Sequence, residues 1–382
     1  MYNQIIFENY KIFKNKQCLD VRPITILFGK NNAGKSAILK LPLLIENSLK
    51  GKSEEVTMPE FNGEALYADI RDLVYRRGTK AVGVELRDDN QRILKYSFYV
   101  DSEEEVKSHI ESWEFSRGGK KDRLGDNLVC DFKGVVPQLN DTLLENEIKS
   151  MRTFIDYIGS VRADVGRDIR QGTTTECSGW RGEKGYTHLL KDALTSTRLL
   201  IGKVSAWYEK TFPGWKIDVD ATGNPVFHIN VSNGDVQTNI VDAGFGITQS
   251  LPIIIRICRP CPDPSLLILE EPEAHLNPAA QGNLGELIAE STNEDHNKRY
   301  LIETHSYNFI LRIRSLIAEG VLSKNDVALY YIGYNDNEKS STLRKVDIDE
   351  KGVVSNWPVD MFEDTYEEVV RLRNAQRKRE GV

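Results

Sequence analysis

The chain has 382 residues and a net charge of −7, with 40% hydrophobic and 28% charged residues, a composition typical of a folded globular protein. The length predicts two or three domain-sized units. The longest apolar runs, such as Leu251–Ile255, are far below the roughly 20 residues that cross a bilayer, and Met1–Tyr10 lacks the basic-then-apolar layout of a secretory signal. We therefore expect a cytoplasmic protein without membrane contact, and the negative charge gives no general attraction to nucleic acid.

Residues 1–100 predict one lobe that contains short strands, a glycine-rich turn, a helix and a hairpin. Hydrophobic periodicity places the strands and the helix at Gln4–Phe13, Cys18–Val21, Ile24–Phe28 and Lys35–Leu49, and the hairpin at 81–100. Ile24–Phe28 is a near-continuous apolar run, as a strand buried on both faces of a parallel sheet requires.

Residues 101–212 are more polar, and we expect them to form a mostly helical insertion. Residues 213–345 predict a second lobe and residues 346–382 a closing strand and a basic tail. The strands expected after the insertion are Trp215–Val219, Pro225–Val231, Val236–Val241, Leu266–Leu269, Tyr300–Ile302, Val327–Ile332 and Thr342–Ile348. Two helices are expected among them, at Pro278–Ser291 with Asn277 as N-cap and from Tyr307 onward.

A phosphate-binding loop follows the third predicted strand. The stretch matches G-x-x-x-x-G-K-[ST] at Gly29, Lys30, Asn31, Asn32, Ala33, Gly34, Lys35 and Ser36. The glycines let successive backbone N–H groups turn toward phosphate oxygens, and the following helix presents its positive end to the same anion. Lys35 supplies a charge for the outer phosphates and Ser36 a hydroxyl for Mg²⁺. These residues therefore predict an ATP site.

Two carboxylates end the buried strand Leu266–Leu269. Parallel strands deliver their C-terminal residues to the edge where ligands bind in α/β sheets. Because strand side chains alternate, Glu270 and Glu271 are expected on opposite sides. We assign Glu270 to Mg²⁺ and Glu271 to the orientation or deprotonation of the attacking water.

A histidine follows the next buried strand, Tyr300–Ile302. His305 is expected at the same sheet edge, where a neutral imidazole can exchange a hydrogen bond with the γ-phosphate or its water. We assign it a catalytic, nucleotide-sensing role.

Together these residues resemble the ABC-type ATPase heads of the RecF/SMC/OLD branch. The loop is similar to the G-x-N-x-x-G-K-S form of that branch, and Glu270–Pro278 resembles its paired acids and the D-loop that follows them. Thr304–Ser306 is similar to the switch-histidine turn, and Asp242–Ser250 to a degenerate signature motif. The resemblance implies an α/β head with a mixed or parallel central sheet, N-terminal antiparallel strands and a helical insertion.

The same resemblance implies a homodimer or larger homo-oligomer that closes around ATP and Mg²⁺. In such a dimer, Gly244 and Gly246 of one subunit would cover the nucleotide held at Lys35 of the other. Two further stretches, Tyr157–Arg170 and Gly352–Phe362, resemble stand-alone bacterial ATPases that are often encoded in anti-phage defence systems.

The sequence leaves two functions open. One is an ATPase that regulates a separately encoded effector, such as a nuclease or toxin; the other is a RecF-like repair ATPase that binds DNA directly. A nuclease within the chain is disfavoured, because Asp347–Asp349 is an isolated D-x-D and few residues follow His305. The basic residues of the tail are consistent with a solvated helix or with a contact for nucleic acid or an acidic partner: Arg371, Arg373, Arg377, Lys378 and Arg379.

Overall fold

The computed structural model describes residues 1–382 except 102–105, 125–129, 140, 171, 223–225 and 359–382. The five basic residues of the tail lie outside the described residues. Within the described part, no helix combines the length and the hydrophobicity that a membrane span needs.

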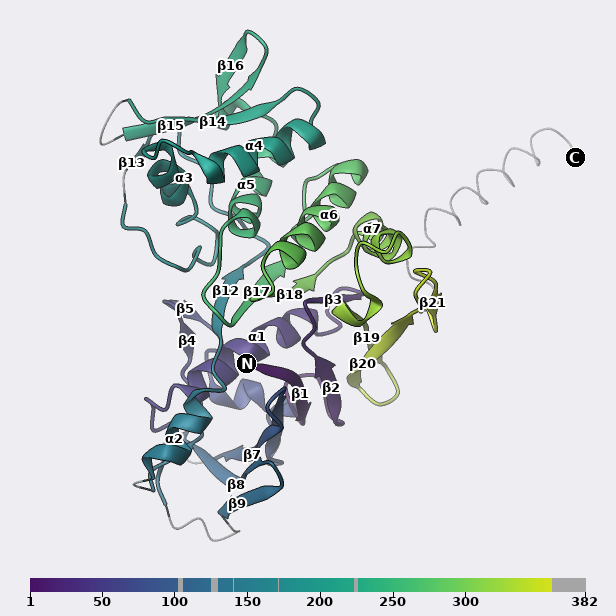
Figure 1. The fold of residues 1–382 in the computed structure, drawn as a ribbon. Helices are drawn as coiled ribbons and strands as arrows, with labels where there is room; N and C mark the ends of the chain where they lie inside the picture. The colour runs from purple at the N-terminus through teal and green to yellow at the C-terminus, as the bar shows by residue number, and fades with distance from the viewer. Residues whose placement is uncertain (102–105, 125–129, 140, 171, 223–225, 359–382) are drawn as a thin grey trace, which may run out of the picture.

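A seven-stranded mixed sheet forms the centre of the molecule (Figure 1). Its strands, in spatial order, are β12 (Phe154–Ile158), β17 (Ser265–Glu270), β18 (Lys298–Glu303), β3 (Ile24–Gly29), β19 (Val327–Asn335), β20 (Ser340–Ile348) and β21 (Val354–Ser355). The first five run parallel, and the last two add antiparallel hairpins. In the register of β17 and β18, Glu270 lies opposite Glu303, so two acids meet at the carboxyl edge of the sheet.

An antiparallel sheet forms the N-terminal lobe. It contains, in spatial order, β2 (Gln17–Asp20), β1 (Tyr2–Glu8), β6 (Val82–Asp88), β7 (Arg92–Val100), β8 (Ser108–Arg117) and β9 (Lys120–Leu124). Helix α1 (Lys35–Leu49) packs its apolar residues into one core with side chains from both sheets. α1 is buried on nearly every side from Leu41 to Leu49, and the polar residues Glu46, Asn47 and Ser48 are buried with the apolar ones.

The other face of the central sheet is covered by helices and a small sheet. The helices are α3 (Tyr186–Ala193), α4 (Leu199–Thr211), α5 (Phe245–Cys258), α6 (Pro278–Glu294) and α7 (Tyr307–Ala318). The small sheet contains β13 (Ile169–Arg170), β14 (Lys216–Asp220), β15 (Val226–Asn233) and β16 (Val236–Asn239). The remaining short elements are β4 (Glu60–Phe61), β5 (Glu64–Ala65), β10 (Phe132–Lys133), β11 (Val136–Pro137), α2 (Thr142–Lys149), and the 3₁₀ turns Ile70–Leu73, Tyr75–Arg77, Ile240–Asp242 and Lys324–Asp326.

The expectation of a mostly helical segment at 101–212 is wrong. Its described residues form the helices α2, α3 and α4, but they also supply β8 and β9 to the N-terminal sheet and β12 to the central sheet. In β8, Trp113 and Phe115 are buried two residues apart, while Glu111 and Glu114 are less buried. A strand with one polar face is stabilised by its neighbour β7, and that pairing is invisible in the local sequence.

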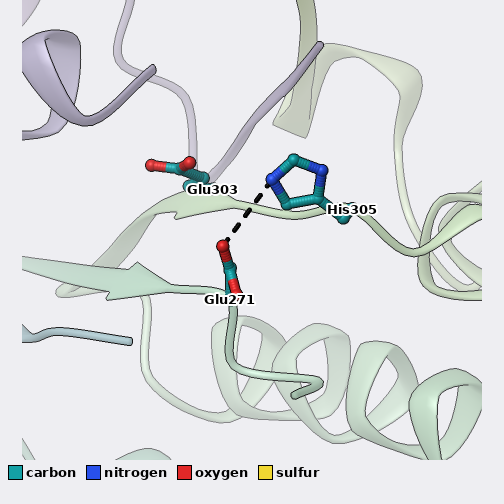
Figure 2. A group of neighbouring side chains, drawn as sticks. All are labelled: Glu271, Glu303 and His305. Carbon is teal, nitrogen blue, oxygen red and sulfur yellow. Dashed lines mark ion pairs between the residues drawn. The ribbon is translucent and has the colours of Figure 1, made fainter. Parts of the chain in front are cut away.

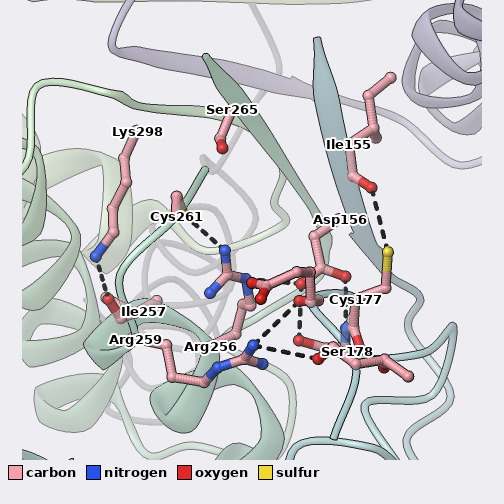
Figure 3. A network of polar contacts seen from close by, with 12 residues as sticks. Ile155, Asp156, Cys177, Ser178, Arg256, Ile257, Arg259, Cys261, Ser265 and Lys298 are labelled. Atoms are coloured by element: carbon pink, nitrogen blue, oxygen red, sulfur yellow. Dashed lines mark hydrogen bonds and ion pairs between the residues drawn. The ribbon is translucent and has the colours of Figure 1, made fainter. Parts of the chain in front are cut away.

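A buried ion pair joins α5 to β12 (Figure 3). Arg256 Nε lies 2.7 Å from Asp156 Oδ2, and both side chains are 1% exposed. The backbone N–H and the hydroxyl of Ser178 also donate to the Asp156 carboxylate, each at 2.8 Å. Burial raises the pKa of Asp156, and the neighbouring Arg256 opposes that shift. The pair fixes the helix that follows the signature-like segment to the edge of the central sheet.

Candidate functional site

The phosphate-binding loop connects β3 to α1, as the sequence predicts. Gly29 and Gly34 have φ angles of +152° and +103°. A Cβ atom on Gly29 would lie 2.3 Å from the carbonyl oxygen of Ile332, and one on Gly34 would lie 2.7 Å from Cγ2 of Ile12. Only glycine fits at these two positions, and α1 begins directly after the loop with its positive end toward the same space.

A cavity of about 390 Å³ opens above the loop. It is lined by Asn31, Asn32, Gly34, Lys35, Ser36, Ala37, Glu271, Glu303 and His305. Residues more than 200 positions apart in the chain therefore share one cavity, because β3, β17 and β18 end at the same sheet edge.

The Lys35 ammonium is folded back onto the loop. Its Nζ donates to the carbonyl oxygens of Gly29 and Lys30, each at 3.0 Å, and lies 3.6 Å from Glu303 Oε1. Burial lowers the pKa of Lys35, and the attraction of Glu303 opposes that shift. Glu303 therefore forms an ion pair with this ammonium, and the charge of Glu271 also attracts it.

Glu303, at the end of β18, is the site residue that the sequence analysis missed. Its Oε2 accepts a hydrogen bond from the Ser36 hydroxyl at 3.0 Å, and its side chain is 7% exposed. Burial and the charge of Glu270 raise the pKa of Glu303 to about 7, and the attraction of Lys35 opposes that shift. The sequence did contain a pattern that indicates Glu303, because an acid ends this apolar strand just as Glu270 ends β17.

Glu271 and His305 face each other across the mouth of the cavity. Glu271 Oε1 lies 3.6 Å from His305 Nε2, and both side chains are more than one-third exposed (Figure 2). Burial lowers the pKa of His305, the Lys35 charge lowers it further and Glu271 opposes both. A lowered pKa favours the neutral imidazole, which can both accept and donate a hydrogen bond.

The backbone of Glu271 leaves the strand geometry that the sequence analysis assumed. Its φ is +43°, and its N–H donates to the carbonyl oxygen of Glu303 at 2.8 Å. The turn after β17, rather than strand alternation, therefore directs the Glu271 side chain into the cavity. A non-glycine residue held at positive φ is typical of functional sites.

The Glu270 carboxylate is held by β12 and the turn that follows it. The Tyr157 hydroxyl donates to Oε1 of Glu270, and the Ser160 N–H donates to its Oε2 at 3.2 Å. The hydroxyl of Ser36, which the sequence places on a shared metal with Glu270, donates to Glu303 instead.

A buried arginine holds the backbone of both strand-end acids. Arg162 is 3% exposed, and its Nη2 donates to the carbonyl oxygens of Glu270 and Glu271 at 2.6 and 2.8 Å. The role of Arg162 was not predicted from the sequence, because no local sequence pattern distinguishes a single arginine in a polar segment.

Glu273 fastens the turn after β17 to the turn after β18. Its carboxylate, 5% exposed, accepts hydrogen bonds from the Thr304 hydroxyl at 2.7 Å and from the His305 N–H at 2.8 Å. Movement of His305 therefore also displaces the turn that carries Glu271.

The signature-like glycines lie at the start of α5. Gly244 is the N-cap residue, and a Cβ on Gly246 would lie 2.7 Å from the carbonyl oxygen of His275. The Phe245 ring, 57% exposed, packs edge-on against His275 with centroids 4.6 Å apart. Gly246 thus lies against the D-loop-like turn, whereas a Cβ on Gly244 would meet nothing within 4 Å, and neither glycine lines the phosphate-loop cavity of the described chain.

The donor set fits a magnesium ion. Carboxylate oxygens of Glu271 and Glu303 and a ring nitrogen of His305 lie within 4.8 Å of one another, and the Ser36 hydroxyl contacts Glu303. Hydroxyl and carboxylate oxygens are the hard ligands that Mg²⁺ prefers, usually with phosphate oxygens and water completing the set. The imidazole suits Mg²⁺ poorly and is better placed as a hydrogen-bonding group.

Comparison with known protein families finds two matches. Residues 135–312 match the family described as "AAA domain, putative AbiEii toxin, Type IV TA system". Residues 322–372 match a family described as a protein of unknown function, DUF3696. No curated protein sequence matches the chain.

Solved structures of SMC heads are similar to the whole chain. An SMC head bound to the C-terminal winged-helix domain of ScpA is 12% identical, covers 91% of this chain and 98% of its own, and has a TM-score of 0.54. The SMC head of Thermotoga maritima is 11% identical, with 91% and 99% coverage and a TM-score of 0.45. A head with an extended coiled coil, bound to the C-terminal domain of ScpA derived from Pyrococcus furiosus, is 13% identical, with 97% and 99% coverage and a TM-score of 0.48.

At these identities the likeness concerns the fold, and the first of the three heads establishes it along most of the chain. The expected class, an α/β head with a mixed central sheet and N-terminal antiparallel strands, is confirmed. The phosphate loop, the strand-end acids and the AAA-domain match agree with that architecture. The chain therefore has the fold of an ABC-type ATPase head as seen in SMC proteins, and its residues 135–312 match an AAA-domain family.

Proposed function

We propose that this protein binds ATP together with Mg²⁺ and hydrolyses it. The observation that carries the proposal is the convergence of Lys35 and Ser36 with Glu271 and His305 around one cavity. Lys35 would hold the outer phosphates by exchanging its contacts with the loop carbonyls for contacts with phosphate oxygens. Bound Mg²⁺ would neutralise charge on the phosphates, with Ser36 and the strand-end acids, Glu270 among them, as candidate ligands.

Glu271 is the proposed water-orienting group. Its carboxylate lies at the mouth of the cavity, where solvent reaches it, and it is 3.6 Å from a ring nitrogen of His305. A neutral His305 can accept a proton or donate a hydrogen bond to the water or the γ-phosphate, and it lines the same cavity as Glu271. Removing such a group costs on the order of 10²–10⁴-fold in rate.

A second copy of the chain would complete the site. Gly244 is exposed and Gly246 is half-buried at the start of α5, beside the half-exposed ring of Phe245. We infer that this end of α5 covers the nucleotide of a partner subunit, so that ATP closes a homodimer and its hydrolysis releases it.

The proposed biological role is the regulation of a separate effector in bacterial anti-phage defence. Two observations support it: the AAA-domain match names a toxin of a toxin–antitoxin system, and a structurally similar SMC head is bound to another protein, ScpA. The D-x-D of the C-terminal strand also has a structural explanation, since Asp349 Oδ1 accepts from the N–H groups of Lys351 and Val353 and closes a turn.

Phosphate release from MgATP by the purified chain tests the activity, with Lys35→Ala as the binding-deficient variant and Lys40→Ala on the same helix as its matched control. Turnover that survives in Lys35→Ala would refute the assigned site. Affinity purification of the tagged protein from its native cell, with ATP present, tests the effector. Recovery of a lone monomer with and without ATP would contradict both the dimer and the effector.

A further inference from the structure

The carboxylate of Glu303 engages the two side chains of the phosphate loop that are expected to hold phosphate and metal. It lies 3.6 Å from the Lys35 ammonium and accepts a hydrogen bond from the Ser36 hydroxyl at 3.0 Å. The two charged side chains are enclosed, since that of Lys35 is 4% exposed and that of Glu303 is 7% exposed, whereas Ser36 is exposed. The cavity therefore holds an acidic group at the place where a nucleotide brings its own negative charge.

A triphosphate that approached Lys35 alone would meet Glu303 as a like charge in a poorly solvated setting, where repulsion is only weakly screened. A divalent cation between the carboxylate and the phosphate would turn that repulsion into attraction. Mg²⁺ is commonly held in this way, by one or two carboxylates together with substrate phosphates.

Glu303 is better placed for this than the acid that the sequence favours. Glu270 already accepts hydrogen bonds from the Tyr157 hydroxyl in β12 and from the Ser160 N–H just after that strand. Glu303 contacts Ser36 directly, and one of its carboxylate oxygens lies within 4.8 Å of a carboxylate oxygen of Glu271.

We propose that Glu303 is a magnesium ligand whose charge makes nucleotide binding depend on the metal. The inference rests on the proposed function and deepens it. Glu303 contacts both Lys35 and Ser36, and with MgATP bound the same carboxylate would belong to the metal site. The Lys35 ammonium is then free for phosphate.

Calorimetric titration with the non-hydrolysable analogue AMP-PNP, in Mg²⁺ and in EDTA, tests the proposal. The wild-type chain should lose affinity on the order of 100-fold when Mg²⁺ is removed. Glu303→Gln should bind in EDTA more tightly than wild type and should respond to Mg²⁺ less than tenfold. Glu303→Asp, which keeps the charge, should retain the metal dependence, and Mn²⁺ paramagnetic resonance should show weakened metal binding in Glu303→Gln alone.

The outcomes separate the two proposals. If the wild type binds the analogue and Glu303→Gln keeps the full metal dependence, the role of Glu303 is refuted while the ATP site stands. The same holds if Glu270→Gln, and not Glu303→Gln, removes that dependence. If the wild type binds no analogue in either condition, both proposals fail. Thermal unfolding of each variant establishes that a loss of binding is not a loss of folding.

Discussion

The Lys35 ammonium and the Glu303 carboxylate form a buried pair 3.6 Å apart at the carboxyl edge of the central sheet. The pair joins the phosphate loop to β18 before any nucleotide is bound. Because burial outweighs the attraction of Lys35, the pKa of Glu303 is about 7, and the carboxylate is an unfavourable charge in the folded protein.

This raised pKa predicts a pH-dependent stability in the absence of nucleotide and metal. Above about pH 4.3 the unfolded chain releases the Glu303 proton, whereas the folded protein keeps it until the pH approaches 7. The resulting stabilisation is fully present below about pH 4.3 and is lost as the pH rises through about 7. Wild type should lose about 2 to 3 kcal/mol of unfolding free energy between pH 5 and pH 8 that Glu303→Gln does not lose. Urea unfolding at both pH values measures the gap, and the exposed Glu290→Gln is the control. Parallel pH curves for wild type and Glu303→Gln would contradict the prediction.

Replacing Glu271 by glutamine should separate binding from hydrolysis. The amide keeps the size of the side chain but cannot take a proton from water, so turnover should fall on the order of 10²–10⁴-fold while ATP affinity stays within a few-fold. Steady-state phosphate release and equilibrium ATP binding measure the two effects, and size-exclusion chromatography with ATP should show a persistent dimer. Unchanged turnover in Glu271→Gln would remove the residue from its assigned role.

Arg162 should act on the reaction through the backbone that it holds. Arg162→Ala leaves the carbonyl oxygens of Glu270 and Glu271 without their buried donor, which should lower the unfolding free energy by about 2 kcal/mol. Because the turn that aims Glu271 loosens, kcat should fall on the order of 10–100-fold with little change in KM. Arg162→Lys, which keeps a donor and a charge, should be intermediate in both measurements. If Arg162 has only a structural role, Arg162→Ala would lower the stability and leave kcat per folded molecule unchanged.

The Asp156–Arg256 pair predicts a large and non-additive stability effect. Asp156→Ala leaves a guanidinium that is 1% exposed without its carboxylate, and such losses cost about 3–5 kcal/mol. Combining it with Arg256→Met removes the uncompensated charge, so the double variant should be more stable than Asp156→Ala alone. Urea unfolding of the two single variants and the double variant measures the coupling. Additive losses would show that the two residues do not stabilise each other.

Local patterns in the sequence predict the elements around the phosphate loop well. α1 spans Lys35–Leu49 as expected, and α6 begins at Pro278 with the Asn277 side chain accepting from the Ala280 N–H. Both follow from short-range chemistry: a glycine turn before one helix, and a capping amide with a proline before the other.

The elements that the sequence failed to predict depend on distant partners. β12 is a five-residue run whose role as a central strand comes from its parallel pairing with β17, more than 100 residues away. The positive φ of Glu271 and the contact between Ser36 and Glu303 likewise follow from the docking of three strand ends. The local sequence of these segments does not predict the strand pairing, the backbone angle or the contact.

Strand β12 connects helix α5 to the strand-end acid Glu270. Its adjacent residues Asp156 and Tyr157 point to opposite faces, one toward Arg256 in α5 and the other toward Glu270. Two adjacent residues of one strand therefore link α5 to Glu270. If another molecule binds to α5, we expect the amide hydrogen-exchange rates of β12 and of its neighbour β17 to change together.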